Sequence, residues 1–286
     1  MNLLIVGASG YIGKQLMHAA CGLTTTFSTV RGTSSRGADG LLHLDLAKPL
    51  EFDLAVIEHS DIVLLPAAIS SPDICAREFE RTWAVNVTGT TTFISAAIAR
   101  GARVIFFSSD TVYGEREIAF GEMVPCKPVG EYAVMKHEVE SRFLSSPQFK
   151  TMRLSYVFSR DDKFTRYLAG CAMRGEEAEV FHPFYRAVIH RDDVVAVALD
   201  LARRWDESFE AVINVGGPAC ISRIEFAVLL RDQMLPTLHF RQIEPVPDFF
   251  VNRPRTINMK SDLLAPLLGR PAHTLAKAIQ IEGKLP

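Results

Sequence analysis

Short apolar runs alternate with longer segments of helical periodicity through the first half of the chain. Most of the runs are rich in β-branched and aromatic residues, and they span residues 3–6, 25–30, 41–44, 62–65, 104–107 and 152–158. Continuous apolar strands that alternate with helices are typical of a parallel sheet covered on both faces. The pattern therefore predicts an α/β fold with a doubly wound parallel sheet.

Two long helices are predicted to pack on this sheet. One spans about 72–100, with Pro72 at its start and Gly101 after its end, and the other spans 130–144. Beyond residue 158 the pattern is less regular, and the segment 160–191 is richer in charged and aromatic residues. A further core strand over 211–215 and a helix over 221–230 follow. We therefore expect the chain to leave the sheet and to return to it.

Composition narrows the possible functions. The chain has 286 residues, of which 48% are hydrophobic, so one large domain or two closely packed domains can form a core. The formal net charge of −2 argues against nucleic acid or a membrane surface as partner. Five cysteines, without a CxxC pair, predict neither a disulfide framework nor a metal site. We expect a cytoplasmic protein without a targeting or transmembrane segment.

A glycine-rich turn follows the first predicted strand. Gly7, Gly10 and Gly13 permit a tight turn, a close approach of the backbone to a pyrophosphate and close packing of the following helix. The free amides at the helix start face the anion, and the helix dipole favours its charge. The turn therefore predicts a Rossmann dinucleotide site; its residues are Gly7, Ser9, Gly10, Tyr11, Ile12 and Gly13.

The second predicted strand indicates which dinucleotide binds. A site for NAD usually places an acidic residue there to hold the ribose 2′-hydroxyl. This chain has no acidic residue between Met1 and Ala38, and Arg31 follows the predicted strand, with Ser34, Ser35 and Arg36 close behind. A guanidinium and two hydroxyls suit a 2′-phosphate. We therefore predict that NADPH is preferred; in the other interpretation the arginines are ordinary solvated loop charges, and NAD remains open.

Three residues carry the candidate chemistry. Ser109 ends a predicted strand, at the edge where open α/β sheets bind ligands. Tyr132 and Lys136 lie four residues apart, on one face of a predicted helix. A nearby cation lowers the pKa of a phenol, so Tyr132 is a candidate acid or base.

At this point the chain resembles the extended short-chain dehydrogenase/reductases. The resemblance extends over most of the sequence through GASGYIG at 7–13, SSDTVYG at 108–114, YAVMK at 132–136, IHRDD at 189–193 and INVGGP at 213–218. It implies that Ser109, Tyr132 and Lys136 form the catalytic triad. It also implies residues that contact the cofactor: Asp45 and Leu46 near the adenine, Ala67 and Ala68 near the phosphates or ribose, and Lys136 on the nicotinamide ribose.

Within that family the chain is most similar to the dTDP-4-dehydrorhamnose reductases and related nucleotide-sugar ketoreductases. The similarity rests on SDTVY at 109–113, RLSYVF at 153–158 and the pair Arg253-Pro254. Thr111 replaces an aromatic residue of that pattern, and Tyr156 replaces a tryptophan. The resemblance implies a substrate site that includes Ser109, Asp110, Thr111, Tyr156 and Arg253.

These observations lead to one preferred hypothesis and two alternatives. We expect an NADPH-dependent oxidoreductase that reduces a keto group on a nucleotide sugar; an NAD(P)-dependent nucleotide-sugar epimerase or dehydratase is the first alternative. A non-catalytic, dinucleotide-binding regulatory subunit is the second. We expect a dinucleotide-binding part formed by residues 1–157 and about 187–217, and a substrate-binding part formed by 158–186 and 218–286. The sequence leaves open whether the protein is a homodimer.

Overall fold

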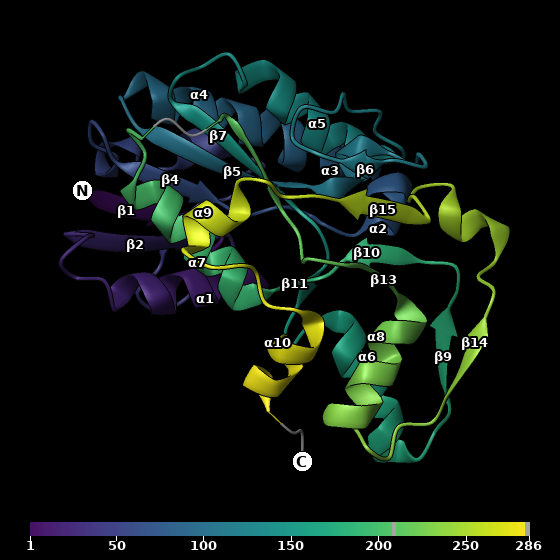
Figure 1. Cartoon of the computed structure of the whole chain (residues 1–286). Helices are drawn as coiled ribbons and strands as arrows, with labels where there is room; N and C mark the ends of the chain where they lie inside the picture. The colour runs from purple at the N-terminus through teal and green to yellow at the C-terminus, as the bar shows by residue number, and fades with distance from the viewer. Residues whose placement is uncertain (208–209, 284–286) are drawn as a thin grey trace.

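A seven-stranded parallel sheet forms the centre of the computed structural model, which describes residues 1–207 and 210–283 (Figure 1). Its strand order is β12-β7-β5-β4-β1-β2-β3. The strands are β1 (Asn2–Ile5), β2 (Thr29–Ser34), β3 (Leu42–His43), β4 (Ile62–Leu65), β5 (Arg103–Ser109), β7 (Phe149–Leu154) and β12 (Val212–Val215). The order reverses direction beside β1, so the predicted doubly wound, Rossmann-like fold is confirmed.

Both faces of the sheet are buried. Ile62 and Leu64 of β4 pack into one core, and Val63 and Leu65 pack into the other. The first face is covered by α1 (Tyr11–Cys21), α7 (Arg191–Arg203) and α9 (Leu264–Leu268), and the second by α4 (Thr90–Ala99) and α5 (Glu131–Phe143) (Figure 1). Because successive strand residues point to opposite faces, burial on both sides requires the continuous apolar runs seen in the sequence.

The long helix predicted over 72–100 is divided into segments. The structure contains α2 (Pro72–Arg77), α3 (Phe79–Trp83), the π-helical turn η3 (Ala84–Gly89) and α4. Glu78, with φ −120° and ψ 48°, leaves the helical conformation between α2 and α3. Within η3, the Asn86 amide bonds to both backbone polar groups of Ile69, at 2.8 and 3.0 Å. The π-helical turn therefore fixes, through Asn86, the loop that follows β4.

Two predicted strands differ most from the observed strands. The second strand was expected over 25–30, but β2 begins at Thr29 and continues to Ser34. The threonines before it belong to a turn, in which the Thr26 amide donates to the Leu23 carbonyl. The run 152–158 is also two strands, because β7 ends at Leu154 and β8 (Val157–Phe158) pairs with β11 (Ile189–His190) outside the large sheet.

The later segments form a smaller part with its own core (Figure 1). A four-stranded sheet has the order β13-β10-β15-β6 and is formed by β13 (Cys220–Ser222), β10 (Tyr185–Ala187), β15 (Thr256–Met259) and β6 (Ala119–Phe120). A separate pair joins β9 (Ala178–Phe181) to β14 (Phe240–Ile243). The helices of this part are α6 (Lys163–Arg174), α8 (Arg223–Gln233) and α10 (Leu275–Glu282). The short 3₁₀ turns are distributed over the whole fold: η1 (Pro49–Glu51) and η2 (Leu54–Val56) lie beside the large sheet, and η4 (Asp110–Tyr113) and η5 (Pro247–Phe250) follow later in the chain.

The division into two functional parts stays a prediction. Most of the C-terminal segment packs in the smaller part, but Leu264 and Leu267 of α9 pack on the core of the large sheet. The predicted ranges 187–217 and 218–286 also include residues 208–209 and 284–286, which lie outside the described residues.

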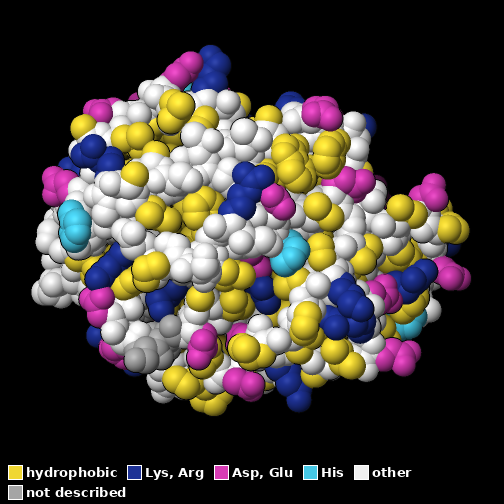
Figure 2. Space-filling model, turned by 90° about the horizontal axis from the view of Figure 1, so that it is seen from above, with side chains coloured by type: hydrophobic (Ala, Val, Ile, Leu, Met, Phe, Trp, Pro, Cys, Tyr) yellow, Lys and Arg dark blue, Asp and Glu magenta, His cyan; other side chains and the backbone are white. Residues whose placement is uncertain are grey.

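Charges of both signs are interspersed on the face seen from above in Figure 2, without a broad area of one sign. This agrees with the small net charge, so binding of a small anion has to depend on local groups. None of the described helices combines the length and the apolar character that crossing a membrane requires.

A buried ion pair connects α5 to β7. Arg153 donates from Nε and Nη2 to the Glu140 carboxylate at 2.6–3.1 Å, and its Nη1 donates to the Tyr113 hydroxyl at 2.9 Å. The Glu140 side chain is fully buried and that of Arg153 is 4% exposed. Such a pair adds little net stability, but removing one partner leaves a buried charge without compensation.

We therefore expect Arg153→Met to lower the free energy of unfolding by about 3–5 kcal/mol, because the buried carboxylate of Glu140 loses the guanidinium that bonds to it directly. Urea unfolding followed by circular dichroism measures the change. Arg142→Met is the matched control on α5, the helix that carries Glu140, since its pair with Glu138 is exposed and should contribute less than about 1 kcal/mol. Equal losses for the two variants would contradict the prediction.

Candidate active site

The glycine turn lies at the carboxyl end of β1 and opens α1. Gly7 has φ +87°, and a Cβ atom added at Gly13 would lie 2.2 Å from the Gly7 carbonyl oxygen. The positive φ and the close approach both explain why glycine occupies these positions. No side chain caps the N-terminus of α1, and its first turn has no acidic residue. The amides of this turn are therefore suited to an anion such as a pyrophosphate.

Arg31 lies inside β2, where it pairs with Leu4, so its predicted position after the strand is wrong. Its guanidinium donates to the Val56 carbonyl oxygen at 2.9 Å, which directs it away from the end of the strand. Arg36 follows the true end of β2 instead. Its side chain is exposed and has no hydrogen bond or ion pair with any described residue.

Ser34 lies at the end of β2 beside the glycine turn. Its hydroxyl is 3.1 Å from the Ser9 hydroxyl, and its oxygen accepts from the Arg36 amide at 3.3 Å. Ser34, Ser35 and Arg36 therefore form the group next to the glycine turn that can meet a 2′-phosphate.

The other predicted cofactor residues lie at the same edge of the sheet. Asp45 and Leu46 follow β3, and Leu46 is buried in the core under α4. Ala67 and Ala68 follow β4, and the Ala67 amide donates to the Val6 carbonyl at 3.2 Å. Ile12 packs on the core beneath α1. The carboxyl ends of β1 to β4 thus bring these residues together.

Tyr11 connects the glycine turn to the segment that follows β8. Its hydroxyl donates to the Ser159 hydroxyl at 2.7 Å, and the Arg191 guanidinium lies 5.3 Å from its ring centre. Burial is the main cause that raises the pKa of Tyr11. The phenol of Tyr11 therefore stays uncharged where it lies beside the glycine turn.

Lys136 lies almost fully buried between α5 and β5. Its ammonium donates to the Phe107 carbonyl at 2.8 Å, lies 4.5 Å from the Phe106 ring centre and 5.8 Å from that of Tyr132. Ser109 ends the same strand two residues after Phe107. The structure thus places Lys136 and Tyr132 of α5 beside β5, whose end carries Ser109.

The protonation states differ from the sequence expectation. Burial lowers the pKa of Lys136 to about 7, while the Glu140 carboxylate acts in the opposite direction. Burial raises the pKa of Tyr132 above its usual value, with smaller contributions from Cys75 and Asp110. The expected lowering by Lys136 is therefore wrong for this structure, because desolvation of the phenolate is the larger effect. Tyr132 is a protonated phenol at neutral pH.

Ser109 and its neighbours form a small polar group. The Ser109 hydroxyl oxygen accepts from the amide and hydroxyl of Thr111, at 3.3 and 3.0 Å, and donates to Asp110 at 3.4 Å. Asp110 is buried; it accepts from the Ser155 hydroxyl at 2.8 Å and lies 3.8 Å from the Arg186 guanidinium. Burial raises its pKa, although the cation and the hydroxyls lower it.

Tyr156 and Arg253, the other two residues predicted to bind substrate, both bond to side chains of the protein itself. The Tyr156 hydroxyl donates to Asp162 at 2.5 Å, and Asp162 caps α6. Arg253 forms an ion pair with Asp73 of α2 and lies over the Phe249 ring at 4.2 Å. Arg253 therefore bridges the loop after η5 to α2, and a direct role of either residue toward substrate stays a prediction.

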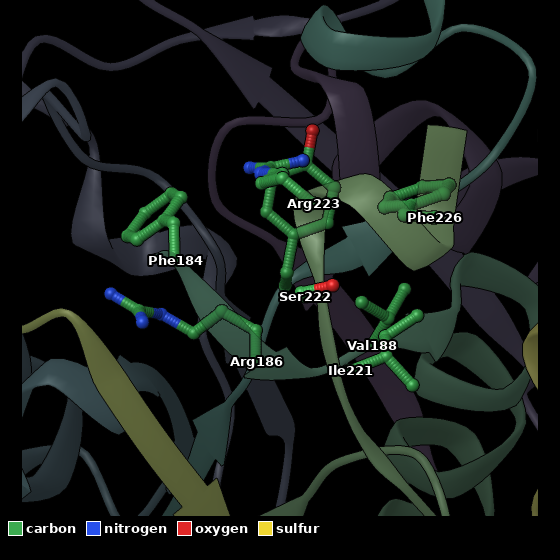
Figure 3. A pocket seen from close by; sticks show the side chains of 8 residues that line it. Phe184, Arg186, Val188, Ile221, Ser222, Arg223 and Phe226 are labelled. Carbon is green, nitrogen blue, oxygen red and sulfur yellow. The ribbon is translucent and has the colours of Figure 1, made fainter. Parts of the chain in front are cut away.

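Arg186 and Arg223 received no role from the sequence. Both line a small cavity in the smaller part, together with Tyr156, Phe184 and Phe226 (Figure 3). One signal was available in the sequence for Arg223. It directly follows the first residue of a Ser-x-x-Glu capping box, where the positive end of a helix disfavours a cation.

Comparison with known proteins agrees with this architecture. Residues 3–216 match the model of a family described as the NAD dependent epimerase/dehydratase family. Methionine adenosyltransferase 2 subunit beta from Pongo abelii is 24% identical, over 93% of this chain and 82% of that protein. The dTDP-4-dehydrorhamnose reductase from Aggregatibacter actinomycetemcomitans is 23% identical, over 81% of this chain and 79% of that protein. The solved structure of MoeE5 in complex with UDP-glucuronic acid and NAD has a TM-score of 0.82 at 21% identity and covers 98% of this chain and 97% of that one.

The buried ammonium predicts a pH dependence of stability. Folding lowers the pKa of Lys136 from 10.5 to about 7, so between these values the unfolded chain binds a proton that the folded chain has released. The stability of the cofactor-free protein relative to Lys136→Met should therefore rise as pH rises through this window, by at most about 1.4 kcal/mol per pH unit.

Urea unfolding of both proteins between about pH 6 and pH 10 measures this difference. Lys163→Met is the control, because Lys163 is exposed on α6 and should give a difference that does not vary with pH. A constant difference for Lys136→Met as well would show that burial does not perturb the ammonium.

Proposed function

Because the chain belongs to the NAD dependent epimerase/dehydratase family, as an NAD(P)-dependent enzyme of the extended short-chain dehydrogenase/reductase type, we propose that it reduces a keto group on a nucleotide sugar with NADPH. The observation that carries the proposal is the state of Tyr132. Its burial favours the protonated phenol, and its hydroxyl has no hydrogen bond to another described residue. A proton is therefore available for an oxygen that becomes negative.

Each residue of the triad has a separate role. When bound, the reduced nicotinamide supplies a hydride to the carbonyl carbon. Tyr132 donates its proton to the carbonyl oxygen as negative charge develops there. Ser109 turns its hydroxyl from the long contact with Asp110 and donates a hydrogen bond to the same oxygen.

Lys136 assists the proton transfer from Tyr132, next to which it lies on α5. Its ammonium is fixed by the Phe107 carbonyl, so it can stabilise the phenolate that Tyr132 becomes without moving toward it. Because burial weakens its own hold on a proton, Lys136 is also suited to pass one onward and restore the phenol.

The preference for NADPH rests on the groups at the end of β2. Ser34, Ser35 and Arg36 offer two hydroxyls and an exposed guanidinium, and β2 ends without a carboxylate to hold the ribose hydroxyls. A planar guanidinium forms paired, charge-assisted hydrogen bonds with a phosphate group. Arg36 therefore replaces Arg31 as the residue proposed to bind the 2′-phosphate.

Two other activities keep specific support. An epimerase or dehydratase uses the same triad, and the family name includes both reactions. In such a reaction the cofactor is reoxidised within the turnover, so NADPH is not consumed. A role as a subunit of another enzyme is favoured by the similarity to a methionine adenosyltransferase subunit. The assays below separate these three activities.

Arg36→Ala should narrow the preference for NADPH over NADH by roughly 1–3 kcal/mol, because a charged hydrogen bond to the 2′-phosphate is lost. Titration of both cofactors by fluorescence measures the two affinities. Arg31→Ala is the matched control and should leave the preference unchanged, since its guanidinium is held by Val56. Tighter binding of NADH than NADPH by the wild type would exclude the cofactor assignment.

Tyr132→Phe should lower turnover by roughly 10²- to 10⁴-fold and leave NADPH affinity nearly unchanged, because it removes the proton donor and keeps the ring. The assay follows NADPH oxidation and product identity with a panel of 4-keto nucleotide sugars. Tyr167→Phe, on the exposed face of α6, is the control and should behave as the wild type does.

Each alternative predicts a different result in this assay. An isomerised sugar without NADPH loss would indicate an epimerase. No turnover with any keto sugar, together with firm NADPH binding, would favour the subunit. Near-normal turnover of Tyr132→Phe would show that another group supplies the proton.

A further inference from the structure

A small cavity is lined by Arg186 of β10 and by Ser222 and Arg223 at the start of α8 (Figure 3). Its volume is about 10 Å³, which is room for one oxygen atom. Phe184 and Phe226 lie on either side of it in Figure 3, and the guanidinium of Arg186 points away from that of Arg223. Arg186 and Arg223 both line the cavity, and their guanidinium groups point in different directions.

Aromatic rings surround the Arg223 guanidinium. Its central carbon lies 4.0 Å from the ring centre of Tyr156, 4.3 Å from that of Phe164, 5.3 Å from that of Phe184 and 5.9 Å from that of Phe226. Rings hold a cation by their faces, but they accept none of its in-plane hydrogen bonds. The Nη1 atom of Arg223 is buried and has no hydrogen-bond partner.

The neighbouring carboxylates are already engaged. Asp162 accepts from the Tyr156 hydroxyl, from the Thr165 hydroxyl and from the amides at the start of α6. Asp110 lies within ion-pair distance of Arg186 rather than Arg223. Within residues 1–207 and 210–283, no carboxylate lies within ion-pair distance of Arg223. Its charge therefore lacks a direct counter-ion.

Arg186, in contrast, is committed to the protein. It donates to the carbonyl oxygens of Tyr185, Arg255 and Pro254, at 2.6, 3.2 and 2.8 Å, and faces Asp110 at 3.8 Å. Burial lowers its pKa to about 10, and repulsion from Arg223 contributes in the same direction. Asp110 thus pairs with Arg186 and not with Arg223, and the repulsion between the two guanidinium groups leaves an electrostatic imbalance at Arg223.

The position of Arg223 adds to this imbalance. It is the first residue of α8, where the positive end of the helix dipole disfavours a cation. Repulsion from Arg186, the dipole and a buried donor without a partner would all be relieved by one bound anion.

We propose that Arg223 is a specificity-determining residue that binds an anionic oxygen of the substrate, contributed by a phosphate or a carboxylate group. The proposal rests on the proposed function, because a nucleotide sugar carries such groups. Asp110 follows Ser109 directly and faces Arg186, which lines the cavity, so the cavity lies close to the end of β5 that carries Ser109. The oxygen enters the cavity, and the rest of the ligand lies outside it.

Calorimetry with dTDP and with D-glucuronate tests the proposal, because the first probe offers phosphate and the second offers carboxylate. We expect Arg223→Gln to bind one of the two probes roughly 10-fold or more weakly than the wild type does, since a charged hydrogen bond is lost. Arg223→Lys retains the charge without the planar fork and should lose less. Arg231→Gln is the control on the same helix, because Arg231 is exposed and pairs with Asp232.

Each result gives a definite outcome. Weaker dTDP binding assigns the phosphate, and weaker glucuronate binding alone assigns the carboxylate. Unchanged binding of both probes by Arg223→Gln, or no binding of either by the wild type, overturns the proposal. Thermal melting without ligand verifies that the variant folds, and a purely structural role would lower this melting temperature without weakening either probe. Failure of the proposed reaction leaves these equilibrium measurements unaffected, because no turnover is involved.

Discussion

The hydrogen bond between the Lys136 ammonium and the Phe107 carbonyl fixes α5 against β5 at the place where the chemistry is proposed to occur. An ammonium buried this deeply is costly unless it has a partner, so α5 can take few other positions along the strand. Tyr132 lies one turn before Lys136, and Ser109 lies two residues after Phe107. One contact thus places both side chains at the same end of β5.

Glu140 continues this pattern one turn further along α5. Tyr132, Lys136 and Glu140 are four residues apart, so a phenol, an ammonium and a carboxylate follow one another along one helix face. Arg153 of β7 holds the last of these groups and is itself bonded to Tyr113 of η4. Glu140 therefore lies between two basic side chains in the core, and its bonds to Arg153 link the helix to two further elements.

The sequence predicted those features that depend on local pattern. Apolar runs predicted the strands of the large sheet, and the glycine turn indicated the dinucleotide site, because φ and close approach restrict these positions to glycine. The error at β2 arose because Thr25 and Thr26 favour strands by composition and yet form a turn. That shift of the strand end moved the phosphate candidate from Arg31 to Arg36. Tertiary burial set the pKa of Tyr132, and single-residue reference values do not include it.

The burial of Tyr132 agrees with the proposed direction of the reaction. A site that oxidises an alcohol first needs a base, and a buried phenol that keeps its proton is a poor one. A site that reduces a ketone first needs an acid, and the same phenol is then in the correct state before the substrate arrives. Desolvation also lowers the pKa of Lys136, so the group behind the phenol holds its own proton less firmly in the free protein. Burial of α5 against β5 thus fixes the position of the phenol and keeps its proton available for transfer.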